Sequence, residues 1–325
     1  MESRGRDGGS MNFLASALLR VPVLGAGFTV MFLPRRVELA AGRALGRLIH
    51  AVGYRRAVSR DNVRRCFPEL DQKACERLLK KNYEHFGILM LELLHLFSPF
   101  PGHYRGYVER NARIEGLEHW ERARAKGRGA VFIASHLGNW ELMVAVGALN
   151  GIPVTMVTKH LKPEWLHRLA ERARVSTGIE PIYEPRTLPA VLRALRAGKA
   201  VGFMMDQYAG PPIGIPVKFF GVEVGTLAAV GTLINRTGTT VVPAFVRRDA
   251  HGIIHVRIEP ELEVGNFLRH AEQGDAGQSG SRKADVQRTT ELLARKVEAW
   301  VRENPEQWLW THRRFKNVVW PRDLA

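Results

Sequence analysis

The segment GAVFIASHLGNWE, from Gly129 to Glu141, joins a short apolar run to a longer one through a polar break. The run from Ala130 to Ala134 contains Val, Phe and Ile and has the length of a buried strand. The second run, from Leu142 to Leu149, has the length of a helix. A strand followed by a tight loop and a helix places that loop at the carboxyl edge of an α/β sheet, where such proteins bind ligands. We therefore expect a functional site at this loop.

The loop contains His136, and Glu141 follows five positions later. Within one helix these residues would lie about 140° apart and would not meet. They can meet if Gly138 and Asn139 form the bend, with Asn139 as the N-cap and Glu141 in the first turn. A carboxylate bound to one imidazole nitrogen fixes the tautomer and raises the basicity of the other nitrogen. The pattern predicts that His136 is a general base oriented by Glu141, although a His and a Glu at this spacing also occur by chance.

The 325 residues carry a formal net charge of +16, with an isoelectric point near 10.4. Such a charge predicts an anionic partner: nucleic acid, a membrane surface, or an acidic substrate or carrier protein. The basic residues are dispersed and form no nucleic-acid-binding signature, so we expect no nucleic acid partner. Cys66 and Cys75 are too few for a disulfide framework and lack a zinc-binding pattern. We expect neither a metal site nor a nucleophilic cysteine.

Changes in composition divide the chain into four parts. Residues 1–10 are polar and glycine-rich, which predicts a disordered tail. Residues 11–36 are largely apolar and end in two arginines, which predicts a helix that anchors the protein in a membrane or lies at its interface. The alternative is a buried amphipathic helix of the fold. Residues 37–110 are predicted to form a helical N-terminal region, and residues 111–325 an α/β core.

In the core region, short strands alternate with helices, which is typical of a parallel sheet with right-handed crossovers. We expect an α/β fold with a mixed, mainly parallel sheet flanked by helices. Two antiparallel exceptions are expected, a hairpin-like flap around Gly221 and a strand pair joined at residues 249–252. A flexible loop over residues 272–283 and a helix over residues 285–303 are predicted before an aromatic, basic ending.

Four short motifs stand out along the chain: NVRRCFPE (62–69), SHLGNWE (135–141), GFMMDQYAGPPIGIPVKFFG (202–221) and PEQWLWTHRRFK (305–316). Together, and in this order, they resemble the bacterial late lipid A acyltransferases, the lauroyl and myristoyl transferases, within the lysophospholipid acyltransferase superfamily. The resemblance implies an α/β acyltransferase core and an N-terminal membrane helix. It also implies transfer of an acyl group from a carrier-protein or coenzyme A thioester to a hydroxyl of a membrane lipid.

The third motif indicates further site residues. Asp206 ends a predicted strand at the same sheet edge as His136, so Asp206 and Gln207 are expected to line the cleft. A turn-capping aspartate is the alternative. Ser135 adjoins His136 but would point to the opposite face of the strand, so we expect direct attack of the acceptor hydroxyl without a covalent intermediate.

Candidate donors to the tetrahedral oxyanion are the backbone N–H groups of Gly138 and Asn139, with Lys159 as a cationic alternative. Lys159 departs from the family, in which arginine is more frequent at this place, and an ordinary surface lysine is the other interpretation. Arg174, by its family placement, is a candidate for binding acceptor phosphates in bidentate fashion. A solvated helix face is the alternative for this arginine.

The function predicted from these features is O-acyl transfer to a membrane glycolipid, most simply a lipid A precursor, at the cytoplasmic face of a bacterial inner membrane. No cofactor is expected beyond the acyl carrier protein or coenzyme A thioester as co-substrate. The expected partners are an acidic acyl carrier protein, an anionic glycolipid and the membrane surface. Alternatives are acylation of another lipid, such as a phosphatidylinositol mannoside or an aminolipid, thioester hydrolysis, or binding without catalysis. No motif specifies the acyl chain length.

Overall fold

The computed structural model describes residues 20–100, 102–264 and 278–318. The predicted disordered tail, residues 1–10, lies outside this range, as does the first part of the predicted anchor. Residues 20–30 are helical. Among the residues described, no helix is both long enough and apolar enough to cross a bilayer.

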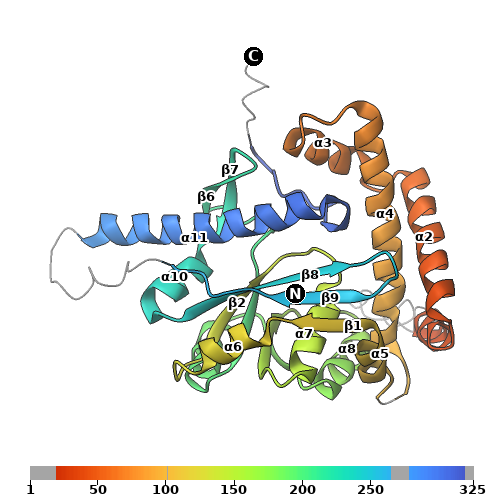
Figure 1. Cartoon of the computed structure of the whole chain (residues 1–325), viewed down its shortest axis with the longest axis horizontal. Coiled ribbons are helices and arrows are strands. Elements are labelled where there is room, and N and C mark those ends of the chain that lie inside the picture. The colour runs from red at the N-terminus through yellow and green to blue at the C-terminus, as the bar shows by residue number, and fades with distance from the viewer. Residues whose placement is uncertain (1–19, 101, 265–277, 319–325) are drawn as a thin grey trace, which may run out of the picture.

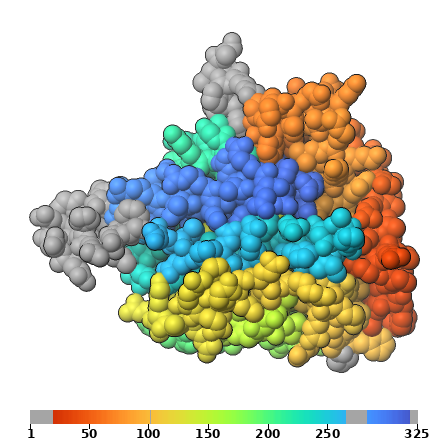
Figure 2. Space-filling model, in the orientation of Figure 1, coloured from red at the N-terminus to blue at the C-terminus, as the bar shows by residue number. Residues whose placement is uncertain are grey.

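A group of helices precedes the first strand. α2 and α4 lie side by side and form one flank of the molecule (Figures 1 and 2). The elements of this group are α2 (Arg35–Val52), α3 (Arg56–Cys66), α4 (Gln72–Leu94), the 3-10 helix η1 (His95–Phe97) and α5 (His103–Asn111).

Glycines permit the close approach of α2 and α4. A methyl group added at Gly46 would lie 2.1 Å from the carbonyl oxygen of Tyr83, and one added at Gly87 would lie 2.1 Å from the carbonyl oxygen of Gly42. The two backbones therefore touch where these glycines face each other. Any larger residue at these positions would push the helices apart and open the interior of this flank.

The predicted sheet is confirmed. Seven strands are arranged in the order β1-β9-β8-β2-β5-β3-β4, and every neighbouring pair is parallel except β8 with β9. The predicted hairpin forms a separate antiparallel pair, β6 with β7. The strands are β1 (Ala112–Glu115), β2 (Ala130–Ala134), β3 (Val154–Thr158), β4 (Glu180–Tyr183), β5 (Ala200–Met204), β6 (Gly214–Phe219), β7 (Val222–Leu227), β8 (Thr240–Arg248) and β9 (Ile254–Ile258).

Helices cover both faces of the sheet, with α6 and α7 on one side and α11 on the other (Figure 1). Figure 2 shows β8 and β9 as a band at the surface beside α11. The helices of this region are α6 (Leu117–Arg124), α7 (Trp140–Leu149), α8 (Glu164–Ser176), α9 (Leu188–Arg196), α10 (Ala228–Thr237), α11 (Gln278–Glu303) and the 3-10 helix η2 (Pro305–Gln307).

α11 begins at Gln278, so the prediction of a flexible loop is wrong for residues 278–283. The other residues of that predicted loop, 272–277, lie outside the described range. The glycine and serines of this segment have low helix propensity, but α11 packs against β6 and α10. Tertiary contacts of this kind override local propensity.

The central strands set up the site. β2 lies between β8 and β5, and its apolar side chains are buried on both faces of the sheet apart from Phe132, which is half-buried. Because β2 and β5 are parallel neighbours, the segments that follow them leave the sheet at the same edge. These two segments carry His136 and Asp206.

Candidate active site

His136 and Asp206 form a hydrogen-bonded pair at the carboxyl edge of the sheet. Nδ1 of His136 lies 2.8 Å from Oδ1 of Asp206, and the backbone N–H of His136 donates to Oδ2 of the same carboxylate at 2.7 Å. The aspartate side chain is 2% exposed and the imidazole 15% exposed. The prediction that Asp206 lies at the same edge as His136 is confirmed. The carboxylate thus fixes both the loop and the ring, and the ring keeps an accessible side.

The electrostatics of the pair favour a histidine that carries its proton on Nδ1. Burial disfavours the imidazolium, but the charge and hydrogen bond of Asp206 outweigh it and raise the pKa of His136. Burial likewise opposes ionisation of Asp206, and the interactions with His136 and Trp308 lower the pKa of this carboxyl. With Nδ1–H donated to the carboxylate, Nε2 is the basic nitrogen. The amide nitrogen of Gln207 lies 3.3 Å from this Nε2, so the structure places Gln207 beside the basic nitrogen of His136.

Glu141 does not orient His136, which corrects the prediction from the sequence. Its two carboxylate oxygens accept hydrogen bonds of 2.6 Å and 3.1 Å from Nε and Nη2 of Arg174 on α8. Both side chains are less than 10% exposed. Glu141 does lie in the first turn of α7, as expected, but its side chain points toward α8 and not toward the loop.

Arg174 is buried and not on a solvated helix face. Burial lowers the pKa of the guanidinium, but the Glu141 carboxylate more than compensates and raises it. The bidentate geometry that was expected for a lipid phosphate is used here for Glu141.

Gly138 and Asn139 form the bend, and the N–H of Gly138 and the side chain of Asn139 are engaged in structural contacts. Asn139 is the N-cap of α7, as predicted, and its Oδ1 accepts from the N–H of Leu142 at 3.0 Å. Asn139 is 0% exposed, and the N–H of Gly138 donates to the carbonyl oxygen of Gln307 at 3.1 Å. The prediction that the Gly138 N–H receives the oxyanion is therefore wrong, because that donor already has a partner inside the protein.

Gly138 is required at this bend for two reasons. Its φ is +60°, in the left-handed region. A methyl group at this position would also lie 2.6 Å from the carbonyl oxygen of Val246 on β8. The His136 loop is thus pressed against the neighbouring strand.

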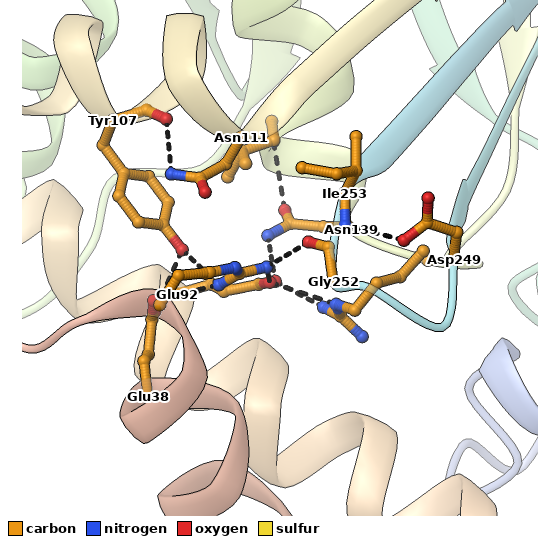
Figure 3. Close-up of polar contacts among 12 residues, drawn as sticks. Glu38, Glu92, Tyr107, Asn111, Asn139, Asp249, Gly252 and Ile253 are labelled. Atoms are coloured by element: carbon orange, nitrogen blue, oxygen red, sulfur yellow. Dashed lines mark hydrogen bonds and ion pairs between the residues drawn. The ribbon is translucent and has the colours of Figure 1, made fainter.

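A buried polar network lies behind the bend (Figure 3). Glu92 of α4 is its centre: Oε2 accepts from the side-chain amide of Asn139 at 2.7 Å, and the carboxylate forms ion pairs with Arg248 and Arg35. The Glu92 side chain is 0% exposed. Burial raises the pKa of this carboxyl, but the two arginines outweigh it and lower the pKa to about 2. Glu92 therefore stays ionised and fixes Asn139 from behind.

The segment that follows α11, residues 305–309, links Arg248 of the Glu92 network back to the His136 loop. The backbone N–H of Arg248 donates to Oε1 of Gln307 at 2.7 Å, and Nε2 of Gln307 donates to the Arg248 carbonyl at 2.9 Å. The backbone of the same segment pairs with the His136 loop, because the N–H of Leu309 donates to the His136 carbonyl at 3.2 Å. Trp308 lies between these contacts, and its Nε1 donates to Oδ2 of Asp206 at 2.8 Å. The segment thus holds the loop and the carboxylate at once.

The aromatic ending of the chain is packed into the core. Trp308 is 1% exposed and Trp310 is 0% exposed, so both indole rings are buried. Arg314 is also 0% exposed, and its Nη1 donates to the carbonyl oxygens of Gln207 and Gly225, each at 2.7 Å. Burial lowers the pKa of this guanidinium to about 10. Arg314 thereby ties the segment after β5 to the β6–β7 hairpin.

Lys159 lies at the end of β3 with its side chain 78% exposed, and its Nζ is 3.6 Å from Oε2 of Glu184. These contacts fit the surface interpretation and include no contact with His136.

Trp140 places its ring edge-on to the imidazole of His136, with the two ring centroids 4.9 Å apart. In the described parts of the chain, no group of three or more His, Cys, Asp or Glu side chains is arranged to hold a metal ion.

Glu92, Arg248, Gln307 and the role of Trp308 were not predicted from the sequence. Glu92 lies in an apolar stretch, GILMLELL, where a single carboxylate requires a buried partner. That signal was present, but the partners are 156 and 57 positions away in the chain. No local pattern identifies contacts over such distances.

Comparison with known proteins identifies the family of the chain. The sequence matches the bacterial lipid A biosynthesis acyltransferase family over residues 13–317. It is 26% identical over 300 residues to the lipid A biosynthesis lauroyltransferase of Escherichia coli K12, covering 90% of each chain. It is 24% identical over 299 residues to the palmitoleoyltransferase of the same organism, covering 90% of this chain and 89% of the relative. The phosphatidylinositol mannoside acyltransferase of Mycolicibacterium smegmatis is 25% identical over 212 residues, 64% of each chain. The chain therefore belongs to the bacterial lipid A biosynthesis acyltransferase family.

Proposed function

We propose that this O-acyltransferase moves a fatty acyl group from an acyl carrier protein or coenzyme A thioester to a hydroxyl of a membrane glycolipid, most simply a lipid A precursor. The family and the relatives named for lipid A biosynthesis support the reaction class and the acceptor class. The pair formed by His136 and Asp206 carries the mechanism.

In this mechanism, Nε2 of His136 takes the proton of the acceptor hydroxyl as its oxygen attacks the thioester carbonyl carbon. The C–O bond forms, the C–S bond of the tetrahedral intermediate breaks, and the imidazolium returns the proton to the departing thiolate. Asp206 is a positioning residue that holds the tautomer and stabilises the imidazolium. The products are an ester and a free thiol, so no external base is consumed.

This proposal assigns Glu141 and Arg174 to positioning and not to proton transfer. Their ion pair joins the first turn of α7 to α8, and α7 begins directly after the His136 loop. Lys159 is proposed only as a contact for the anionic acceptor or donor, because its exposed ammonium can reach groups outside the protein.

Association with the membrane is proposed for the N-terminal region. Phe28, Phe32 and Phe100 expose 46%, 67% and 51% of their surface and form an aromatic cluster with ring distances of 5.0 Å and 6.0 Å. Arg36 nearby is exposed. Aromatic rings beside arginines suit the headgroup level of an anionic bilayer, here the cytoplasmic face of an inner membrane. The net charge of +16 also suits an acidic carrier protein as donor.

The direct test is transfer by the purified full chain, with acyl carrier protein and coenzyme A thioesters compared as donors and a lipid A precursor in mixed micelles as acceptor. Mass spectrometry should detect a product heavier by one acyl group. His136→Ala should lower turnover by about 10²–10⁴-fold. His251→Ala is the control, because His251 is exposed on the turn between β8 and β9. Thiol release without an acylated lipid would instead indicate a hydrolase.

A second acceptor class is favoured by one observation, the similarity to a phosphatidylinositol mannoside acyltransferase over 64% of the chain. The same assay with phosphatidylinositol mannoside in place of the lipid A precursor separates the two acceptors. We expect the lipid A precursor to be the better substrate, because the relatives named for lipid A biosynthesis match over 90% of the chain.

A further inference from the structure

A cavity lies between α8 and the segments formed by residues 95–100 and 102–104. Its empty volume is about 340 Å³, near the lower end of the range of about 300–1,000 Å³ that is usual for ligand pockets. Neither His136 nor Asp206 is among the residues that line it. α8 contributes side chains spaced three and four positions apart, which share one face of the helix. These side chains are Leu169, Arg172, Ala173 and Ser176.

The hydroxyl of Tyr104 is a buried donor that has no acceptor within the described part of the chain. Tyr104 lines the cavity and is 2% exposed, and its hydroxyl oxygen has no hydrogen-bond partner. Burial and then the charge of Glu141 raise the pKa of this phenol, so the hydroxyl keeps its proton. A buried polar group normally has a partner, because leaving it without one costs free energy. The Tyr104 hydroxyl is therefore available to a ligand in the cavity.

Arg172 supplies the cavity with a positive charge. Its Nη2 donates to the carbonyl oxygen of Ser98, on the opposite wall, at 3.2 Å. This bond uses one of the five N–H donors of the guanidinium and leaves the others for solvent or a ligand. None of the described residues that line the cavity is acidic. A guanidinium in such surroundings suits a ligand with several oxygen acceptors, such as a phosphate group.

The other polar groups of the wall are already used inside the protein. Nδ1 of His95 lies 2.7 Å from Nε2 of His103, and Nε2 of His95 lies 3.2 Å from Oε1 of Glu38. The hydroxyl of Ser176 donates to the carbonyl oxygen of Ala173 at 2.7 Å. The ligand is thus met by Tyr104 and Arg172, which both donate hydrogen bonds, and no lining carboxylate opposes an anion.

The cavity borders the exposed aromatic cluster of the N-terminal region. Phe100 lines the cavity, is 51% exposed, and has its ring 6.0 Å from that of Phe28. The hydroxyl of Ser98 donates to Sδ of Met31, which follows the N-terminal helix, at 3.0 Å. An apolar surface therefore adjoins a site with two donors and a positive charge. This combination suits an amphiphile with an anionic head.

We propose that this cavity binds the phosphate of an anionic membrane phospholipid through Tyr104 and Arg172, with the lipid chains against Phe28 and Phe100. Soluble phosphate offers the same oxygens but has no chains to cover the aromatic rings. The lipid is a bound ligand and not a substrate, so the inference does not depend on the proposed acyl transfer.

The test titrates the purified full chain by calorimetry in a neutral, phosphate-free detergent. The probes are dihexanoylphosphatidylglycerol, inorganic phosphate, and dihexanoylglycerol, which has the chains without the phosphate. The phospholipid should bind at least about 10-fold more tightly than inorganic phosphate, because burial of two methylene groups already contributes that factor. Dihexanoylglycerol should bind at least about 10-fold more weakly than the phospholipid, because it offers no charged acceptor to the two donors.

Tyr104→Phe and Arg172→Gln should each weaken phospholipid binding by about 10- to 100-fold. Without ligand, Tyr104→Phe should unfold at the same urea concentration as the wild type or a higher one, because the lost hydroxyl has no partner in the described structure. A purely structural hydroxyl would instead lower that concentration. Arg168→Gln is the matched control: Arg168 lies one turn earlier on α8, is exposed, and does not line the cavity. This variant should bind like the wild type.

Unchanged phospholipid binding in Tyr104→Phe and Arg172→Gln would overturn the inference, and so would equal affinity for dihexanoylglycerol. Equal affinity for inorganic phosphate and the phospholipid would overturn the assignment to a lipid. If Arg172→Gln does not fold, the result with Tyr104→Phe decides. No acyl donor is present in these titrations, so a negative result leaves the proposed function standing, and wild-type transfer tests that function separately.

Discussion

The indole Nε1 of Trp308 donates to Oδ2 of Asp206 at 2.8 Å, so a residue near the end of the chain helps to hold the carboxylate that orients His136. The same oxygen accepts the backbone N–H of His136. The geometry of the His136–Asp206 pair thus depends on three segments that meet only in the folded protein: the loop after β2, the segment after β5 and the chain that follows α11.

Asp206→Asn should change the pH dependence of the reaction. The base must be neutral, so kcat/KM rises with pH as His136 loses its proton. Because Asp206 raises the pKa of His136 above the ordinary 6.5, the wild-type inflection should lie above that value. In Asp206→Asn the inflection should move to lower pH, and the maximum rate should fall by about 10²–10⁴-fold as the tautomer is lost. A pH profile of kcat/KM that is identical in both proteins would contradict the positioning role.

Trp308→Phe should weaken the hold on Asp206 while keeping most of the aromatic packing. The lost hydrogen bond to a buried charged group should cost about 1.5–3 kcal/mol of unfolding free energy, measured by urea denaturation. The maximum rate should also fall. Trp310→Phe is the comparison, because Nε1 of Trp310 donates to the carbonyl oxygen of Pro305 and not to the site. A similar loss of activity in both variants would indicate a general packing effect.

Asn139→Ser separates the two tasks of Asn139. The serine hydroxyl can still cap α7, but the amide donor to Glu92 is lost. We expect a fall in kcat with little change in KM, because the His136 loop loses its support and the substrate-binding surface is untouched. Asn139→Ala should lose a further amount of about 0.5–2 kcal/mol in unfolding free energy, because this variant also removes the cap of α7. Equal stability of the two variants, or a wild-type kcat in Asn139→Ser, would contradict this division.

Glu141→Gln should destabilise the protein strongly. It leaves the Arg174 guanidinium buried without its carboxylate, which typically costs about 3–5 kcal/mol. Glu109→Gln is the control: its partner is Arg105, both side chains are at least 50% exposed, and the expected cost is about 0–1 kcal/mol.

The double variant Glu141→Leu, Arg174→Met tests whether Glu141 takes part in chemistry. It removes both charges and should recover much of the stability lost in the single variant. If Glu141 only positions α7, the double variant should recover activity as well. If folding is restored but turnover is not, Glu141 takes part directly in the reaction.

The sequence alone was sufficient for the elements that depend on local patterns. The apolar run from Ala130 to Ala134 predicts β2 because a buried strand must be apolar on both faces. Asn139 predicts the start of α7 because its side chain satisfies an N–H group that the helix leaves free. The alternation of strands and helices likewise predicts a mainly parallel sheet, and a strand's carboxyl end predicts where His136 lies.

The tertiary structure decided which carboxylate meets the histidine. Glu141 is near in sequence and Asp206 is 70 positions away, yet the parallel pairing of β2 with β5 brings Asp206 to the imidazole. Helical geometry turns Glu141 toward Arg174 instead. Strand order, unlike strand position, is set by long-range packing that no short segment encodes.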